Sequence, residues 1–345
     1  MAGSPSKKGL YARGLVAKHP KTPNQTLARM LCRDKPQWFE TMDAARSIVR
    51  YVRGNHGEPN RIKGDRSLHR PNGEAGKPYL PPPSLADVWQ PYLFNKAKKP
   101  LLVSDIHSPF HDTRALKVAI QYGLDQGCDG LILNGDVADM YALSRFDRDP
   151  ERRNFKEEID RLRDMLASFR DKFPKKPIVY KAGNHEERLD HFIWAKAPEL
   201  WGLEEVRLPN ILGLDKLKID FVTDRRYILF HGQWSPDERV PIGGLPIFHG
   251  HELSGTNNSV NVARGSFMRT MHTMICGHSH RTSHHVEDDM FHSKEISCWS
   301  VGALCELHPY WQRTAKWNHG LAILHKEGDD FLVENRRISR RGRVW

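Results

Sequence analysis

The chain lacks the long apolar segments that would place it in a membrane. Its mean hydropathy is −0.63, and no apolar run approaches the roughly 20 residues of a membrane helix. The first residues, Met1 to Lys8, contain no apolar stretch of the kind that a signal peptide carries. We therefore expect a cytoplasmic protein that has no membrane partner.

Cysteine is also scarce, and its pattern excludes two classes of protein. The five cysteines are odd in number and form no CxxC pair: Cys32, Cys128, Cys276, Cys298 and Cys305. A disulfide framework and a zinc-thiolate site are therefore not expected, and a reducing compartment fits best.

The length of 345 residues suits one large domain with an appendage, or two domains. Positive charge is unevenly distributed along this length. Residues 1–99 contain 19 lysines and arginines against 7 acidic residues, whereas residues 100–345 contain 34 against 35. A basic segment, 336–345, closes the chain. Such asymmetry predicts a region that binds a polyanion, most often nucleic acid. A solvated tail is the alternative.

Residues 1–55 have the pattern of a small helical region. We predict helices over 26–31 and 41–53, the second capped by Thr41. On that helix Arg46, Arg50 and Arg53 share one face. This is the outline of a helix-turn-helix, although a helical hairpin packed on the main domain would look the same. The Gly- and Pro-rich residues 56–99 read as a linker, whose aromatic end around Trp89 docks on the next domain.

Residues 100–335 alternate between apolar strands and amphipathic helices. Strands are predicted over 101–104, 130–134, 177–181, 226–230, 245–248 and 273–276, helices over 113–126 and 155–173, and a late hairpin around Gly328. We therefore predict an α/β layered fold of sheets flanked by helices. In such folds, sites form at the carboxyl ends of strands.

Five short polar segments follow apolar runs in this region. They are Asp105-Ile106-His107, Gly135-Asp136-Val137-Ala138-Asp139, Gly183-Asn184-His185-Glu186, His249-Gly250-His251 and Gly277-His278-Ser279-His280. Each alone is a weak signal, and their joint occurrence in this order favours a dinuclear metal site. Oxygen and imidazole ligands without thiolate suit Mn, Fe or Zn, with Mn the first choice for assays.

The five segments resemble the signature of the calcineurin-like metallophosphoesterases: D-x-H, G-D-x-x-D, G-N-H-[D/E], a lone His and G-H-x-H. The resemblance covers about residues 100 to 335. The basic N-terminal region is similar to that of family members carried by phages and prophages, and such an origin would place the protein in a host cytoplasm. The resemblance implies two divalent metal ions. The first would be held by Asp105, His107 and His280, the second by Asn184, His249 and His278, and Asp136 would bridge both.

The resemblance also implies roles for residues that bind no metal. His185 would assist phosphoryl transfer or protonate the leaving oxygen, and Asp139 would orient it. Arg188 is a candidate phosphate clamp, with a surface salt bridge to Glu187 or a neighbour as the alternative. His249 is preferred as the fourth-segment ligand over His251 and His231, because it directly ends an apolar strand.

The resulting expectation is a metal-dependent phosphoesterase. Its substrate would be a nucleic-acid phosphodiester or, alternatively, a phosphomonoester of the Ser/Thr phosphatase type, and a DNA-binding protein with a non-catalytic scaffold is a further alternative. The oligomeric state is left open. Trp299, Tyr310, Trp311 and Trp317 are expected to pack in the core rather than to wall a substrate pocket.

Overall fold

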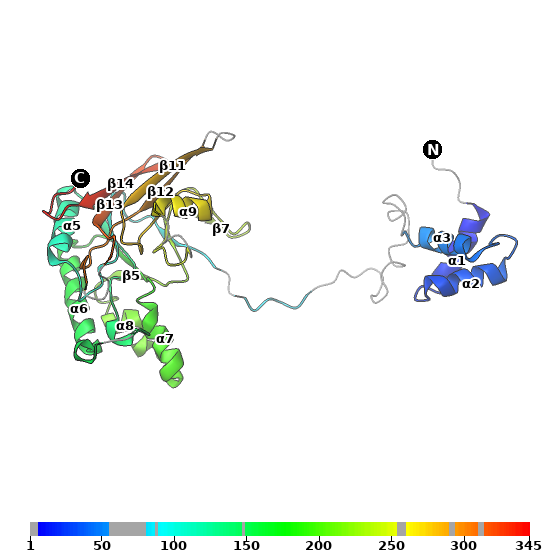
Figure 1. Cartoon of the computed structure of the whole chain (residues 1–345), viewed down its shortest axis with the longest axis horizontal. Coiled ribbons are helices and arrows are strands. Elements are labelled where there is room, and N and C mark those ends of the chain that lie inside the picture. The colour runs from blue at the N-terminus through cyan, green and yellow to red at the C-terminus, as the bar shows by residue number, and fades with distance from the viewer. Residues whose placement is uncertain are drawn as a thin grey trace. The chain divides into compact units, whose positions relative to one another are not determined.

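The computed structural model divides the chain into two compact units, Met1–Ala86 and Asp87–Trp345 (Figure 1). It describes residues 6–54, 81–86, 89–146, 149–253, 260–289, 294–309 and 314–345. Most of the predicted linker, residues 55–80, lies outside the described residues, as do Tyr310 and Trp311. None of the described helices is long and apolar enough to cross a membrane.

The N-terminal unit consists of three helices around a small apolar core. They are α1 (Lys7–Lys18), α2 (Asn24–Asp34) and α3 (Met42–Val52). The Thr41 side chain accepts a hydrogen bond from Ala44 N, which confirms the predicted cap. The core contains Val16, Leu27, Leu31 and Val49. The first helix was not predicted, because only Ala12 and Val16 are buried along it.

One predicted basic residue of α3 has an internal role. The guanidinium of Arg53 donates to Asn24 Oδ1 at 2.6 Å and to the carbonyl of Thr22 at 2.7 Å. It therefore ties the α1–α2 loop to the end of α3 instead of facing solvent with Arg46 and Arg50, which are exposed.

Two six-stranded sheets form the second unit. The order in one is β14-β13-β2-β3-β4-β5, and the order in the other is β1-β6-β9-β10-β12-β11. The first sheet contains β2 (Pro100–Val103), β3 (Gly130–Asn134), β4 (Ile178–Lys181), β5 (Ile219–Val222), β13 (His319–Glu327) and β14 (Asp330–Ile338). The second contains β1 (Tyr92–Phe94), β6 (Ile228–Phe230), β9 (Leu245–Ile247), β10 (Met274–Cys276), β11 (Ser283–Asp289) and β12 (Lys294–Ser300). A small ribbon pairs β7 (Gln233–Ser235) with β8 (Val240–Ile242).

Buried residues of the first sheet alternate between two apolar layers. Leu131 and Leu133 of β3 face a layer shared with helices, whereas Ile132 faces a layer shared with the second sheet. Because both faces of the sheet are covered, β2, β3 and β4 are continuous apolar runs in the sequence, which is why these three strands could be predicted. The strand order β2-β3-β4-β5 is parallel throughout.

Helices cover the outer faces of both sheets (Figure 1). The first sheet is covered by α5 (Thr113–Asp125), α6 (Phe155–Lys172), α7 (Glu187–Lys196) and α8 (Leu208–Leu212), and α9 (Val262–Thr270) packs on the second. Short 3-10 turns, including η2 (Tyr141–Leu143), η3 (Pro150–Arg152), η4 (Pro198–Leu200) and η5 (Glu204–Val206), connect them. This helix–sheet–sheet–helix arrangement confirms the predicted α/β layered class.

Two predicted segments differ from the structure at their edges. Residues 336–338 belong to β14, and Trp345 exchanges backbone hydrogen bonds with Arg337, so residues 336–345 are not a separate tail. At the other end, β1 pairs with β6 and therefore belongs to the sheet rather than to a linker. Trp89 rests against Tyr227 with ring centroids 5.0 Å apart, as its predicted docking requires.

Candidate metal centre

All five polar segments lie at the carboxyl ends of strands, as predicted. Asp105 follows β2, Asp136 follows β3, and Asn184 follows β4 in the first sheet. His249 follows β9 and His278 follows β10 in the second. The candidate ligands thus come from both sheets and meet at one end of the layer between them.

The backbone at these strand ends is unusual. Asp105, His107, Asp136, His278 and His280 all have φ between 49° and 63°. Non-glycine residues rarely adopt this left-handed conformation, and its cost is accepted mainly at functional sites. Two motif glycines allow close approach: a Cβ on Gly183 would overlap Asp136 Oδ1, and one on Gly277 would overlap Ser104 Oγ.

The imidazoles crowd around two buried carboxylates. His249 Nε2 lies 3.2 Å from Asp136 Oδ2, and His280 Nε2 lies 3.2 Å from Asp105 Oδ1. His107 Nε2 lies 3.2 Å from His280 Nε2 and 3.8 Å from Asp136 Oδ2. Asp136 takes part in two of the groups that could hold a metal ion, one with His249 and His278 and one with Asp105 and His107.

Four buried atoms in this cluster have no hydrogen-bond partner: Asp105 Oδ1, Asn184 Oδ1, His249 Nε2 and His278 Nδ1. Buried polar atoms normally have partners, so each of these atoms requires an explanation. All four belong to the residue types that bind divalent metals, and they come from four different segments. The residues present therefore fit the two metal ions that the sequence motifs imply.

The carboxylates and imidazoles of the cluster shift one another's pKa values. Desolvation opposes ionisation of Asp136, yet the surrounding histidines hold its pKa well below the ordinary value. Burial likewise opposes protonation of His249, but Asp136 and Asp105 raise its pKa to about 10. For His278, burial and the nearby His249 lower the pKa to about 4, which keeps that imidazole neutral and able to bind metal.

Hydrogen bonds fix the orientation of the ligand rings. His249 Nδ1 donates to the carbonyl of Asn134 at 2.8 Å, which aims Nε2 at the carboxylates. His107 Nδ1 donates to Asp139 Oδ1 at 2.9 Å. Supporting contacts of this kind hold metal-binding histidines in place.

Asp139 contacts two histidines in different ways. Its carboxylate is hydrogen-bonded to His107, and its backbone carbonyl accepts a 2.8 Å hydrogen bond from His185 Nδ1. The predicted contact between Asp139 and His185 is therefore present, but it is made mainly by the main chain. Burial disfavours charge on His185, yet the carboxylates of Asp136 and Asp139 raise its pKa.

Arg188 contacts His185 rather than Glu187. Its Nη1 donates to the Asp139 carbonyl at 2.9 Å, and its Nη2 lies 3.0 Å from His185 Nε2. Glu187 instead accepts from His251 Nε2 at 2.8 Å. The expected alternative, a salt bridge to Glu187 or a neighbour, is met by a neighbour, because Arg188 Nη1 lies 4.0 Å from Asp139 Oδ2.

Glu186 ends the Gly183-Asn184-His185-Glu186 segment, but the sequence assigned it no role. Its buried carboxylate accepts hydrogen bonds from Asp136 N at 3.0 Å, Ala138 N at 2.9 Å, Gly183 N at 2.7 Å and the Tyr180 hydroxyl at 2.7 Å. The three backbone donors come from two different loops, and the Tyr180 hydroxyl comes from β4. Glu186 therefore fixes the distance between the loops that carry Asp136 and Asn184.

A buried ion pair supports the other side of the centre. Lys181, fully buried at the end of β4, lies 2.7 Å from Glu252 Oε1. Glu252 in turn accepts from Gly250 N at 2.7 Å, next to His249. No sequence pattern marked this pair, because Lys181 continues an apolar strand and Glu252 follows the His-Gly-His segment.

The other two histidines considered for the fourth segment make contacts outside the two carboxylates Asp105 and Asp136. His251 is engaged with Glu187, and His231 Nε2 contacts the carbonyl of Ala97 at 2.6 Å. Only His249 reaches the two carboxylates, since its Nε2 is also 3.9 Å from Asp105 Oδ1.

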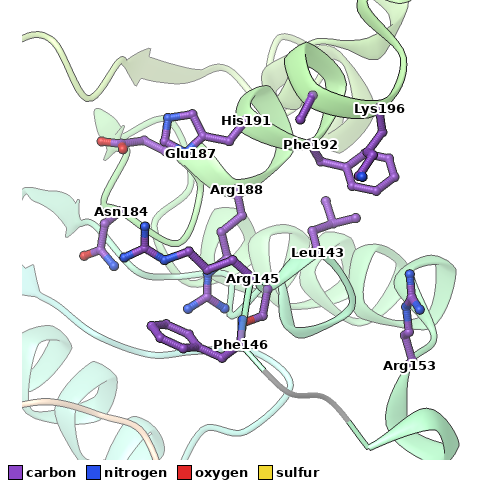
Figure 2. A pocket seen from close by; sticks show the side chains of 12 residues that line it. Leu143, Arg145, Phe146, Arg153, Asn184, Glu187, Arg188, His191, Phe192 and Lys196 are labelled. Carbon is purple, nitrogen blue, oxygen red and sulfur yellow. The ribbon is translucent and has the colours of Figure 1, made fainter.

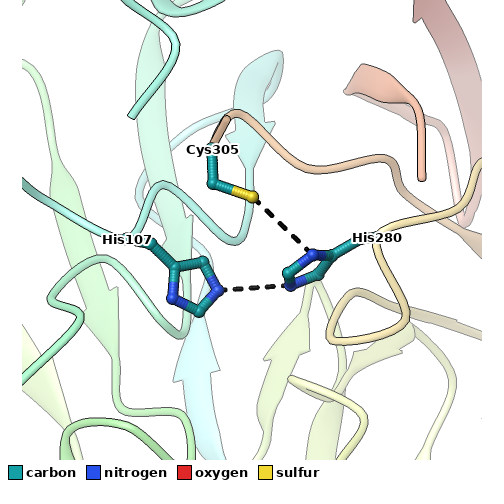
Figure 3. A group of neighbouring side chains, drawn as sticks. All are labelled: His107, His280 and Cys305. Carbon is teal, nitrogen blue, oxygen red and sulfur yellow. Dashed lines mark hydrogen bonds between the residues drawn. The ribbon is translucent and has the colours of Figure 1, made fainter. Parts of the chain in front are cut away.

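A thiol lies close to the centre, contrary to what cysteine usage suggested. Cys305 Sγ is 3.7 Å from His280 Nδ1, whereas the other ring nitrogen of His280, Nε2, faces His107 (Figure 3). A cavity of about 340 Å³ opens over the cluster and includes Cys305, Phe146 and Trp317 in its walls. Trp317 therefore walls the site instead of packing in the core, whereas Trp299 is buried as predicted.

Comparisons with known proteins relate the chain to phage proteins. No family model matches it. The Gene 54 protein of Mycobacterium phage L5 is 27% identical over 266 residues, covering 72% of this chain and 99% of that protein, and its counterpart in Mycobacterium phage D29 is 24% identical over the same shares. Among solved structures, Vacuolar Protein Sorting 29 from Cryptosporidium parvum aligns with a TM-score of 0.37 at 13% identity, covering 72% of this chain and 95% of that one. Wild-type Vps29 from Entamoeba histolytica, complexed with Zn²⁺, aligns with a TM-score of 0.32 at 11% identity, covering 72% and 96%. By sequence, the chain is similar to two mycobacteriophage proteins over almost their whole length.

Proposed function

We propose that the protein is a metal-dependent phosphoesterase that hydrolyses a phosphodiester in nucleic acid. One observation carries the proposal: four ligand atoms that make no hydrogen bond within the described part of the chain converge from separate strand ends with the buried Asp136, beneath an open cavity. A cluster of this kind is costly to keep unless it binds cations, because each unpartnered buried atom weakens the fold.

Each metal would have its own ligand set. Asp105, His107 and His280 would hold one ion, Asn184, His249 and His278 the other, and Asp136 would contact both. When bound, two such ions acidify a shared water and stabilise the attacking and leaving oxygens of an in-line displacement. Mn, Fe and Zn all suit this donor set.

The remaining residues act on the substrate. His185 lies over Asp136, with its Nε2 3.8 Å from Asp136 Oδ2, and with its raised pKa it can hold a proton and pass it to the leaving oxygen. The Asp139 carbonyl keeps the ring in place. Arg188, next to His185 Nε2, can bind a non-bridging phosphate oxygen.

The N-terminal unit supports nucleic acid as the substrate. Its third helix presents Arg46 and Arg50 to solvent, and residues 1–99 contain in total 19 lysines and arginines against 7 acidic residues. Changing both arginines to Gln should weaken DNA binding and reduce the slope of log K against log salt by about 2. An unchanged slope would remove the unit from substrate binding.

The proposal is tested by Mn-dependent hydrolysis of bis-p-nitrophenyl phosphate beside p-nitrophenyl phosphate, with Asp136→Asn as the control. We expect turnover of the diester that the control lacks. Preference for the monoester would indicate a phosphatase of the Ser/Thr type instead.

Metal analysis separates an enzyme from a scaffold. After reconstitution and desalting, we expect close to two divalent ions per chain, and fewer for His249→Ala. A chain that retains less than one ion and hydrolyses neither ester would be a scaffold kept for binding.

A further inference from the structure

A second cavity, of about 650 Å³, adjoins the candidate metal centre (Figure 2). Its walls are the loop after η2, Arg153 and one face of α7. It includes the proposed ligand Asn184, and it shares Phe146 and Arg188 with the cavity over the metal ligands. A substrate held at the centre can therefore extend into this space.

One face of α7 forms a track of cavity-lining residues that begins beside the centre and leads away from it. Arg188, Phe192 and Lys196 follow one another at intervals of four residues, which places them on the same side of the helix. At 1.5 Å per residue, the track from Arg188 to Lys196 is about 12 Å long. That length exceeds what a single phosphate needs.

The charge of this cavity is positive. Arg145, Arg153 and Lys196 line it and are exposed, with no acidic partner among the residues that the structure describes. The acidic residue in its described lining, Glu187, is paired with His251 at 2.8 Å. The cavity thus offers unpaired cations to a ligand with more than one phosphate.

Aromatic rings are interleaved with these cations. Phe146 is 64% exposed and Phe192 is 37% exposed, and both line the cavity. In Figure 2 the Phe146 ring lies near the Arg188 end and the Phe192 ring near Lys196. Exposed rings beside cations are what unstacked nucleic-acid bases bind, through stacking that does not depend on sequence.

We infer that this cavity binds the unpaired nucleotide next to the scissile phosphodiester, so that the protein acts on single-stranded segments of nucleic acid. The inference rests on the proposed phosphodiesterase activity and adds to it the substrate's strandedness. Phe192 would stack a base, and Arg153 and Lys196 would bind flanking phosphates. A paired base could not use the ring, because its faces are already stacked in the duplex.

The test uses the full-length protein with Mn and three substrates: a single-stranded oligonucleotide, the same sequence as a duplex, and bis-p-nitrophenyl phosphate. The variant is Phe192→Ala with Lys196→Gln. Its matched control on α9, Met268→Ala with Arg269→Gln, also removes an exposed apolar side chain and an exposed cation. We expect the wild type to prefer the single strand. In the variant, the ratio of kcat/KM for the single strand to that for the small diester should fall about tenfold or more, the usual cost of losing a stacked base.

A second readout does not depend on catalysis. In Asp136→Asn, the fluorescence of a 2-aminopurine base placed beside the cleavage position should be quenched on binding, and Phe192→Ala should abolish that quenching. If the wild type hydrolyses none of the three substrates, the proposed hydrolysis fails, while the quenching still tests the cavity. Equal ratios in the variant and its control together with quenching that survives Phe192→Ala would overturn the inference.

Discussion

Glu158 gives a stability prediction that the structure makes quantitative. It lies on α6, 5% exposed, and its Oε1 accepts a 3.0 Å hydrogen bond from Ala142 N while its buried Oε2 has no partner. Burial raises its pKa to about 7, against the hydrogen bond from Ala142 and with a contribution from Asp139. Glu158→Gln keeps the shape and the acceptor but cannot ionise.

The sign follows from the proton that the folded state retains. A carboxyl whose pKa rises from 4.5 to about 7 on folding stabilises the fold fully only below its ordinary pKa. This contribution is lost as the pH rises through about 7. At roughly 1.4 kcal/mol per pKa unit, the wild type should lose roughly 2–3 kcal/mol relative to the Gln variant between about pH 5 and about pH 8.

Urea unfolding followed by tryptophan fluorescence measures this difference, with both proteins in a chelator so that metal binding does not contribute. Glu157→Gln, on the exposed side of the same helix, is the matched control for the removal of a carboxyl group. Parallel pH profiles for the wild type and Glu158→Gln would refute the reasoning, because they would mean that Glu158 ionises in the fold as it does in water.

Three further predictions concern the centre and its supports. Asp136→Asn should lower Mn-dependent ester hydrolysis by roughly a hundredfold or more with an unchanged urea midpoint, and wild-type turnover would exclude the mechanism. Glu186→Gln leaves backbone donors of two loops unsatisfied and should cost about 3 kcal/mol of unfolding free energy; a loss under about 1 kcal/mol in urea titrations would show that the loops do not depend on this carboxylate. Lys181→Met leaves Glu252 buried without its cation and should cost about 3 kcal/mol, which Glu252→Gln in the same chain should partly restore in thermal unfolding.

The strands that carry the ligands could be predicted from the sequence because they are buried on both faces. Runs such as Leu131-Ile132-Leu133 leave little ambiguity, and the polar residues that end them mark the site. By contrast, β11 and β12 were missed, since Ser283–Asp289 is mostly polar and follows no apolar run. The helix α7 was missed for a related reason: only Leu189 and Ile193 are buried along it.

The supports of the site were less visible still. From the sequence alone, the backbone amides that bind Glu186 and the carboxylate that pairs with Lys181 could not be predicted. Those contacts depend on how β3 and β4 lie side by side and on how the second sheet approaches them. Likewise, the cavity beside α7 could not be predicted, because the exposed Phe192 breaks the amphipathic pattern from which the helix could have been predicted.

The division of the proposed ligands between the sheets has a mechanical consequence. Asp105, Asp136 and Asn184 belong to one sheet, and His249 and His278 belong to the other. Bound ions would cross-link the two sheets, so that movement of one sheet over the other would have to break coordination bonds as well as apolar packing. In a single-molecule pulling experiment, the domain with bound metal should unfold at a higher force than the domain without it. The fraction of molecules that unfold at the higher force should increase with the metal concentration.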